Sequence, residues 1–204
     1  GVGRPGLKDP NEHGFDYFYG YICMNHAHNC YPEFVIRNGE KVALQNVLEE
    51  KWRGRVPDGA GVAAKKVDFV PHLCQKEVLQ FIDRNKEKQF FLYYALNIPH
   101  ANNEGGRAGM EVPSYGEFAD KDWPDPEKGF AAMIAKMDHD VGRLFALLKV
   151  LAIDQKTLVL FTGQQPSGCR VRVGRLPAIQ RDARVLLHAL GRLAAMPHVL
   201  EHLD

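Results

Sequence analysis

Polar side chains suited to acid–base chemistry follow directly on one very apolar segment. Residues 90–104 read FFLYYALNIPHANNE, so His100, Asn102 and Asn103 come just after an apolar run and a proline. An imidazole at the end of a buried strand can donate to an anionic substrate or protonate a leaving oxygen. The same pattern fits a loop histidine that bonds a backbone carbonyl, so both roles of His100 stay open at this point.

A second group of histidines lies in the segment HAHNC, residues 26–30. If this segment were extended, His26, His28 and Cys30 would share one face, and together they could chelate zinc. No second cluster of ligand residues accompanies them in the sequence. We therefore favour a structural or substrate-contacting role for His26 and His28, and we assign no metal ligand.

Two further polar runs have ordinary explanations. MDHDVGRL (137–144) would place Asp138, Asp140 and Arg143 on the polar side of a helix. Asp138 could turn inward to hold a loop, but an Asp140–Arg143 ion pair on a solvated face is the commoner arrangement. The arginines of CRVRVGR (169–175) could bind phosphates, although so short a run seldom does.

Composition and charge exclude several classes of protein. With 45% hydrophobic and 25% charged residues, the chain has the composition of a soluble globular protein. A formal charge of +1 gives no reason to expect nucleic acid or a membrane surface as a partner, and no apolar run has the length of a membrane span. The four cysteines form no zinc or redox spacing, which leaves a Cys23–Cys30 bridge and the compartment open.

The elements that must position these residues alternate between helix and strand. Apolar spacing predicts helices over 71–87 and from about 127 to 152, and buried strands over 89–97 and 156–162. Unbroken hydrophobicity in the strands indicates a sheet covered on both faces. The predicted fold is therefore an α/β domain with a mainly parallel sheet flanked by helices. In such sheets ligands bind beyond the carboxyl ends of the strands, where His100 would lie.

Turn residues and one long loop complete the pattern. Asn38-Gly39, between the two apolar runs of residues 34–44, predicts a β-hairpin. The glycines and prolines of residues 54–61 predict an exposed loop. The connection over 98–126 is longer than is needed to join two elements, and such length is typical of functional loops.

The composition changes abruptly near Thr162. Every aromatic residue and every lysine lies before Thr162, whereas the remainder of the chain carries six arginines. We therefore divide the chain into a domain over residues 1–162 and a tail of different composition over residues 163–204.

Several segments together resemble the type I sulfatases of the alkaline-phosphatase-like superfamily. These segments, in order within residues 1–162, are GFDYFYGY, YPEFVIRNGEKV, IPHANNE, MEVPSYGEFADKDWP and AAMIAKMDHDVGRL. The resemblance implies part of an alkaline-phosphatase-like α/β fold and the hydrolysis of sulfate esters of carbohydrates or aryl compounds. It also implies a periplasmic or extracellular location.

The chemistry of that family sets roles for the residues above. A formylglycine made from Cys or Ser in a C-x-P/A-x-R motif attacks sulfur, while calcium and basic residues hold the sulfate oxygens. His100 matches the histidine of the family's Pro-His element, which implies a catalytic role at the sulfate or the leaving group. We take His26, His28, Asn102 and Asn103 as candidate substrate-binding residues.

The sequence also departs from the family. It holds no C-x-P/A-x-R motif, and Thr162 is followed by Gly163, Gln164 and Gln165 where the family has Ser-Asp-Asn with calcium-binding Asp and Asn. Neutral glutamines are poor substitutes for a carboxylate on calcium. We therefore expect neither tight calcium binding nor turnover from this chain alone. A gene truncated upstream and read out of frame after about Thr162 would explain these departures. A genuine but divergent tail over residues 163–204 stays open as the alternative.

Two rival interpretations stay open. A non-catalytic binding or structural protein could keep the middle of the fold without its chemistry. A phosphatase or phosphodiesterase relative would share the sheet but would require clustered Asp and His metal ligands, which the sequence does not present.

Overall fold

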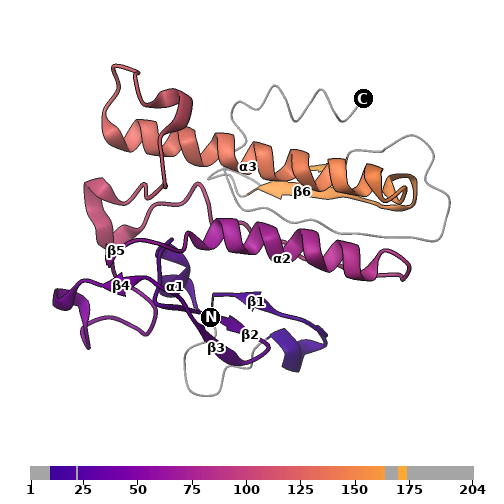
Figure 1. Ribbon diagram of the computed structural model, residues 1–204, viewed down its shortest axis with the longest axis horizontal. Coiled ribbons are helices and arrows are strands. Elements are labelled where there is room, and N and C mark those ends of the chain that lie inside the picture. The colour runs from indigo at the N-terminus through magenta and orange to yellow at the C-terminus, as the bar shows by residue number, and fades with distance from the viewer. Residues whose placement is uncertain (1–9, 22, 164–169, 174–204) are drawn as a thin grey trace. The chain divides into compact units, whose positions relative to one another are not determined.

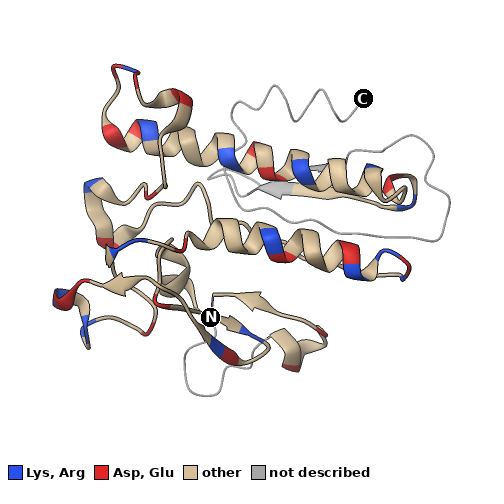
Figure 2. Cartoon of the chain, in the orientation of Figure 1, with Lys and Arg blue, Asp and Glu red and all other residues tan. Residues whose placement is uncertain are grey.

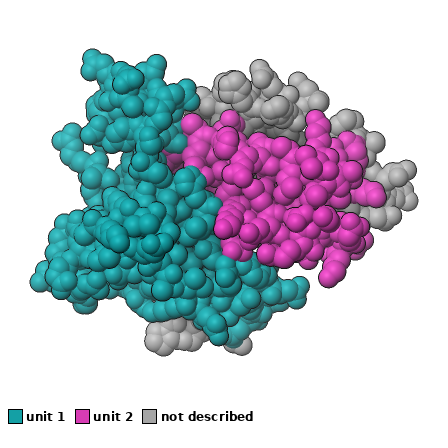
Figure 3. All heavy atoms as spheres, viewed as in Figure 1, with its two compact units in different colours: residues 1–74, 100–132 teal, residues 75–99, 133–204 magenta. Residues whose placement is uncertain are grey.

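The computed structural model, drawn in Figure 1, describes residues 10–21, 23–163 and 170–173. The chain divides into two compact units, coloured separately in Figure 3. The first unit comprises residues 1–74 and 100–132, and the second comprises residues 75–99 and 133–204. The predicted boundary at residue 162 is not tested by this division, and most of the predicted tail lies outside the described residues.

The first unit holds short strands that pair antiparallel. The strands β1 (Tyr19–Gly20), β2 (Phe34–Arg37) and β3 (Glu40–Ala43) form one sheet in that order, and β4 (Val47–Leu48) pairs with β5 (Ala63–Lys65). The short helices of this unit are η1 (Pro10–His13), α1 (Met24–His28), η2 (Glu50–Trp52), η3 (Asn103–Ala108) and η4 (Gly116–Phe118). Its buried apolar side chains include Tyr31, Phe34, Val35, Ile36 and Phe69.

The predicted hairpin at Asn38-Gly39 is confirmed. The strands β2 and β3 pair antiparallel up to Arg37 and Glu40, so two residues make the turn. The φ angles are 49° at Asn38 and 84° at Gly39. A tight hairpin turn needs positive φ at both positions, and Asn and Gly adopt it with the least strain.

Two long helices match the predicted ones closely. They are α2 (Val70–Asn85) and α3 (Asp125–Val150), and each begins in the first unit and ends in the second. Within the second unit their buried apolar side chains are Val78, Ile82, Met133, Met137, Val141, Leu144 and Leu148. The buried amide of Gln75 donates to the Asp140 carbonyl over 2.8 Å, which joins the two helices inside that unit.

Charges of both signs lie along α2 and α3 (Figure 2), but one predicted ion pair is wrong. Asp140 is 1% exposed and pairs with Lys136, whereas Arg143 is exposed. Residues three and four apart in a helix are both neighbours, so spacing alone did not choose between the two cations. The helix turns Asp140 toward its covered side, where Lys136 reaches it.

The strand predicted over 89–97 is absent, since these residues belong to no helix or strand. Their burial still alternates: Tyr94 and Leu96 are buried, whereas Phe91 is 49% and Tyr93 is 45% exposed. Alternation is the pattern of extended backbone with one covered face. The prediction of cover on both faces was therefore wrong, because an apolar run by itself does not show how many faces are packed.

The predicted parallel sheet is also not found among the described residues. The second predicted strand begins later, at β6 (Leu160–Gly163), after the short helix η5 (Asp154–Lys156), and it pairs antiparallel with β7 (Arg170–Val173). All strand pairs in the described part of the chain are antiparallel. The two-residue turn between β2 and β3 permits only that direction, because a parallel pair needs a crossover connection of a dozen or more residues.

No helix in the described part of the chain combines the length and apolar character of a membrane-crossing segment.

Candidate functional site

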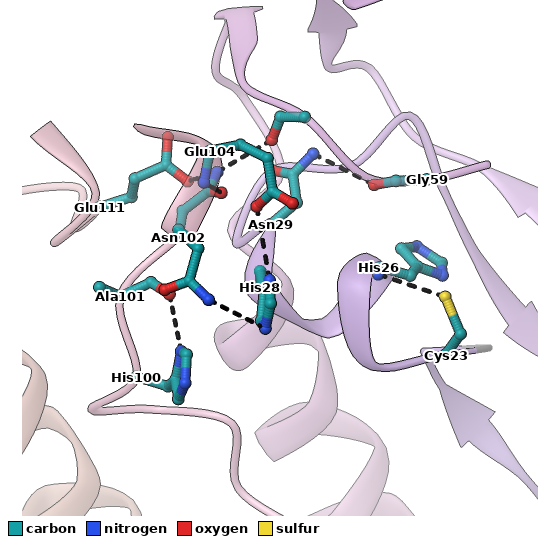
Figure 4. A network of polar contacts seen from close by, with 12 residues as sticks. Cys23, His26, His28, Asn29, Gly59, His100, Ala101, Asn102, Glu104 and Glu111 are labelled. Atoms are coloured by element: carbon teal, nitrogen blue, oxygen red, sulfur yellow. Dashed lines mark hydrogen bonds and ion pairs between the residues drawn. The ribbon is translucent and has the colours of Figure 1, made fainter. Parts of the chain in front are cut away.

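His100 begins the second stretch of the first unit, and its side chain is exposed. Its Nδ1 atom lies 2.7 Å from the Ala101 carbonyl oxygen (Figure 4). Because a carbonyl can only accept, Nδ1 carries the proton and Nε2 is the unprotonated nitrogen of the neutral ring. No described residue hydrogen-bonds to Nε2. This atom can therefore take up a proton, or donate one when the ring is charged.

The ring of His28 stacks in parallel with the ring of His100 (Figure 4). The two ring centroids are 5.0 Å apart and the planes differ by 2°. His28 is the last residue of α1, and its Nδ1 atom is 3.4 Å from Glu104 Oε2. Its Nε2 atom is 3.5 Å from the amide nitrogen of Asn103. The structure thus brings together three of the predicted residues, and Glu104 joins them as a fourth.

His26 lies apart from this cluster, which corrects the expectation of a shared face. The segment is helical rather than extended, and side chains two positions apart on a helix point in different directions. Figure 4 shows His26 beside Cys23 and away from His28. Its ring is fully buried, and Nε2–H donates to the Phe34 carbonyl oxygen over 2.9 Å. Burial lowers the pKa of His26 to about 4. This histidine is part of the core.

The cysteines of the same segment are not bridged. Neither Cys23 nor Cys30 forms a disulfide, and Cys30 is fully buried. Cys23 precedes α1, and its sulfur accepts a hydrogen bond from the His26 backbone amide over 3.4 Å. The Cys23–Cys30 bridge left open by the sequence is therefore not formed in this structure.

Asn102 is fully buried and all of its side-chain atoms bond within the chain. Its amide nitrogen donates to the Gly61 carbonyl and to Glu111 Oε2, each over 2.9 Å. Its side-chain oxygen accepts from the Glu104 backbone amide over 3.2 Å, which starts the helix η3. These bonds fix the shape of the loop that follows His100, and a contact between Asn102 and substrate stays a prediction.

A buried carboxylate continues the same network. Glu111 is 4% exposed, and the carboxylate oxygen not bonded to Asn102 lies 2.7 Å from Lys66 Nζ. The Lys66 ammonium is also 5.6 Å from the centroid of the Tyr31 ring, a cation–π distance. Burial, with smaller contributions from Cys30 and Glu111, raises the pKa of Tyr31. The charge of Glu111 is thus paired, as a buried carboxylate requires.

The close approach at Gly109 gives a direct test of this loop. A Cβ atom on Gly109 would lie 2.2 Å from the Asn102 carbonyl oxygen, closer than any side chain tolerates. We expect Gly109→Ala to lower the free energy of unfolding by about 1 to 2 kcal/mol, measured by urea denaturation, because the backbone must shift.

Gly142→Ala is the matched control. Gly142 lies in α3 with nothing within 4 Å of its built Cβ, so this change should raise stability by about 0.5 to 1 kcal/mol. Equal stability of Gly109→Ala and wild type would contradict the tight packing of the loop.

Sequence reasoning missed Glu104 and Glu111. Glu104 stands at the end of the segment IPHANNE, four residues after His100, and this proximity was the one available signal. Glu111 had none, since its partners Lys66 and Asn102 are 45 and 9 residues away in the chain. The described residues contain no group of three or more His, Cys, Asp or Glu side chains that could hold a metal ion. Gln164 and Gln165, at the family's calcium positions, lie outside the described residues.

Comparison with known proteins points to one family. Residues 6–164 match the family model described as Sulfatase. The N-acetylgalactosamine-6-sulfatase of Mus musculus is 26% identical over 158 residues, covering 75% of this chain and 26% of that protein. The enzyme of that name from Sus scrofa is 26% identical over 159 residues, with the same coverage. The one from Canis lupus familiaris is 30% identical over 89 residues, 43% of this chain and 15% of that protein. The chain thus spans about a quarter or less of the length of these relatives.

Proposed function

Because the chain belongs to the sulfatase family, we propose that it is part of an enzyme that hydrolyses sulfate esters, with the sulfate ester bound beside His100. The observation that carries this proposal is the cluster of His100, His28, Asn103 and Glu104, at the position of the family's Pro-His element. We also propose that the chain is one portion of the alkaline-phosphatase-like α/β fold that the family implies.

The residues of the cluster would divide the work on an anionic substrate. His100 Nε2 forms no hydrogen bond to any described residue. This nitrogen would donate to a sulfate oxygen or protonate the leaving oxygen. Asn103 is exposed and its amide can donate to the same anion. The exposed position of both side chains is what substrate contact requires.

Members of the sulfatase family use calcium, and a formylglycine supplies their nucleophile. The described residues do not fit a calcium site, because no cluster of three candidate ligands occurs among them. The sequence contains no C-x-P/A-x-R motif for formylglycine. We therefore propose substrate contact, without turnover, as the activity of this chain on its own.

A sulfated carbohydrate is the substrate class that we favour over an aryl sulfate. The curated relatives are named N-acetylgalactosamine-6-sulfatases, so an amino sugar carrying a 6-sulfate is the first compound to test. A periplasmic or extracellular location would agree with such a substrate.

Anion binding to the histidine-labelled chain tests the proposal. We expect N-acetylgalactosamine 6-sulfate and inorganic sulfate to shift the NMR signals of His100 saturably. The signals of exposed His13 and His139 should stay unchanged. Sodium chloride at equal ionic strength controls for screening.

Two outcomes would contradict the proposal. One is the absence of any saturable shift at His100 with either sulfated compound. The other is tighter binding of inorganic phosphate than of sulfate, which would favour the phosphatase alternative. Turnover of a chromogenic aryl sulfate by this chain would show that a nucleophile outside the C-x-P/A-x-R motif is at work.

A further inference from the structure

We propose that Glu104 and His28 form a positioning pair, which holds the imidazole of His100 in one tautomer and one ring orientation. The inference rests on the proposed function, because the pair matters only if His100 contacts the sulfate ester. It changes the role of His28 from a substrate contact to a residue that acts through His100.

The first step is that each ring nitrogen of His28 faces one polar side chain. Asn103 can donate its amide to His28 Nε2 across 3.5 Å, which leaves Nδ1 to carry the proton that faces Glu104 Oε2 at 3.4 Å. His28 Nδ1 and Glu104 Oε2 are both buried, and neither atom forms a hydrogen bond to a described residue. The 3.4 Å approach between them is therefore the polar contact that each atom has. Their side chains are 11% and 15% exposed, so water screens the attraction between the Nδ1–H group and the Glu104 carboxylate only in part.

The second step is that the fixed ring of His28 restrains His100. An exposed histidine ordinarily samples several rotamers and both neutral tautomers. The bond from Nδ1 to the Ala101 carbonyl forms only in one ring orientation. Parallel stacking with His28, at 5.0 Å between centroids, favours that orientation.

The third step is that the pair is anchored in the core of the first unit. The Glu104 backbone amide donates to Asn102, whose side chain is bonded to Gly61 and to the buried Glu111. On the other side, Asn29 follows His28 and its amide donates to the Gly59 carbonyl over 3.2 Å. Glu104 and His28 are therefore each positioned by a buried, hydrogen-bonded asparagine, whereas His100 itself is exposed.

The test reads the tautomer of His100 directly. Long-range ¹H–¹⁵N spectra of the full chain, at a pH where each ring has reached its neutral plateau, separate Nδ1–H from Nε2–H. In wild type we expect a single Nδ1–H pattern for His100 and ring-current shifts of its ring protons. In His28→Ala and in Glu104→Ala we expect loss of the single-tautomer pattern and loss of the ring-current shifts.

A rescue variant separates positioning from a general loss of structure. His28→Phe keeps an aromatic face but no nitrogen, so the ring-current shifts of His100 should return in part. His13→Ala and Glu117→Ala, both at exposed positions of the first unit, should leave His100 unchanged.

Two results would overturn the inference. One is an unchanged His100 pattern in both His28→Ala and Glu104→Ala. The other, which needs no variant to fold, is a mixture of tautomers at His100 in wild type. Sulfate binding is scored separately: a wild-type chain that binds no sulfate but shows the restrained His100 would refute the proposed function and leave the positioning pair standing.

Discussion

In a complete sulfatase that contains this segment, His100→Ala is expected to lower kcat by about 10²- to 10⁴-fold, the range for losing one general acid or base. The reason is that Nδ1 is committed to the Ala101 carbonyl, which leaves Nε2 as the nitrogen able to exchange a proton with substrate. Steady-state kinetics with a sulfated sugar and with an aryl sulfate would measure the effect.

Comparison of two substitutions refines that result. His100→Gln keeps an amide that can donate to a sulfate oxygen but cannot transfer a proton. Compared with His100→Ala, it should bring KM back toward the wild-type value more than kcat. His139→Ala, at a position 71% exposed on α3, is the matched control and should leave both constants unchanged. Activity of His100→Ala within about threefold of wild type would remove His100 from the chemistry.

Acid is expected to destabilise the chain through His26. Burial lowers its pKa from 6.5 to about 4 in the folded chain, against the opposing effects of the Phe34 carbonyl and Asp58. Because the folded-state pKa lies below the unfolded one, the unfolded chain binds the proton more readily between these values. The contribution of His26 to stability is therefore complete above about pH 6.5 and is lost as the pH falls toward 4. At pH 5 the loss amounts to about 2 kcal/mol.

The measurement is urea denaturation at pH 7.5 and pH 5, with two variants for comparison. His26→Gln keeps a donor for the Phe34 carbonyl and has no charge to gain, so its loss of stability between the two pH values should be smaller than that of wild type by about 2 kcal/mol. His13→Ala, at an exposed position, should lose as much as wild type does. If His26→Gln and wild type lose equal amounts, His26 is not the group that titrates.

Local patterns in the sequence were sufficient for the features that depend on near neighbours. Apolar residues at helical spacing located α2 and α3 to within a few residues, because that spacing reflects which side of a helix is covered. Asn38-Gly39 located the hairpin, because few residues adopt positive φ without strain. The family that the segment IPHANNE indicated is confirmed by the match over residues 6–164. The roles that the same segment suggested for His100, Asn102 and Asn103 stay predictions.

Only the tertiary structure decided how those pieces act on one another. His26 and His28 are two residues apart, yet one is a core histidine and the other a partner of His100, because the helix α1 turns them to different sides. Glu104 and Glu111 acquire roles only through contacts with residues distant in the chain. The direction of strand pairing was likewise outside the reach of an apolar run. Burial, partner and direction are properties of the packed chain, and the sequence determines them only through the sum of its long-range contacts.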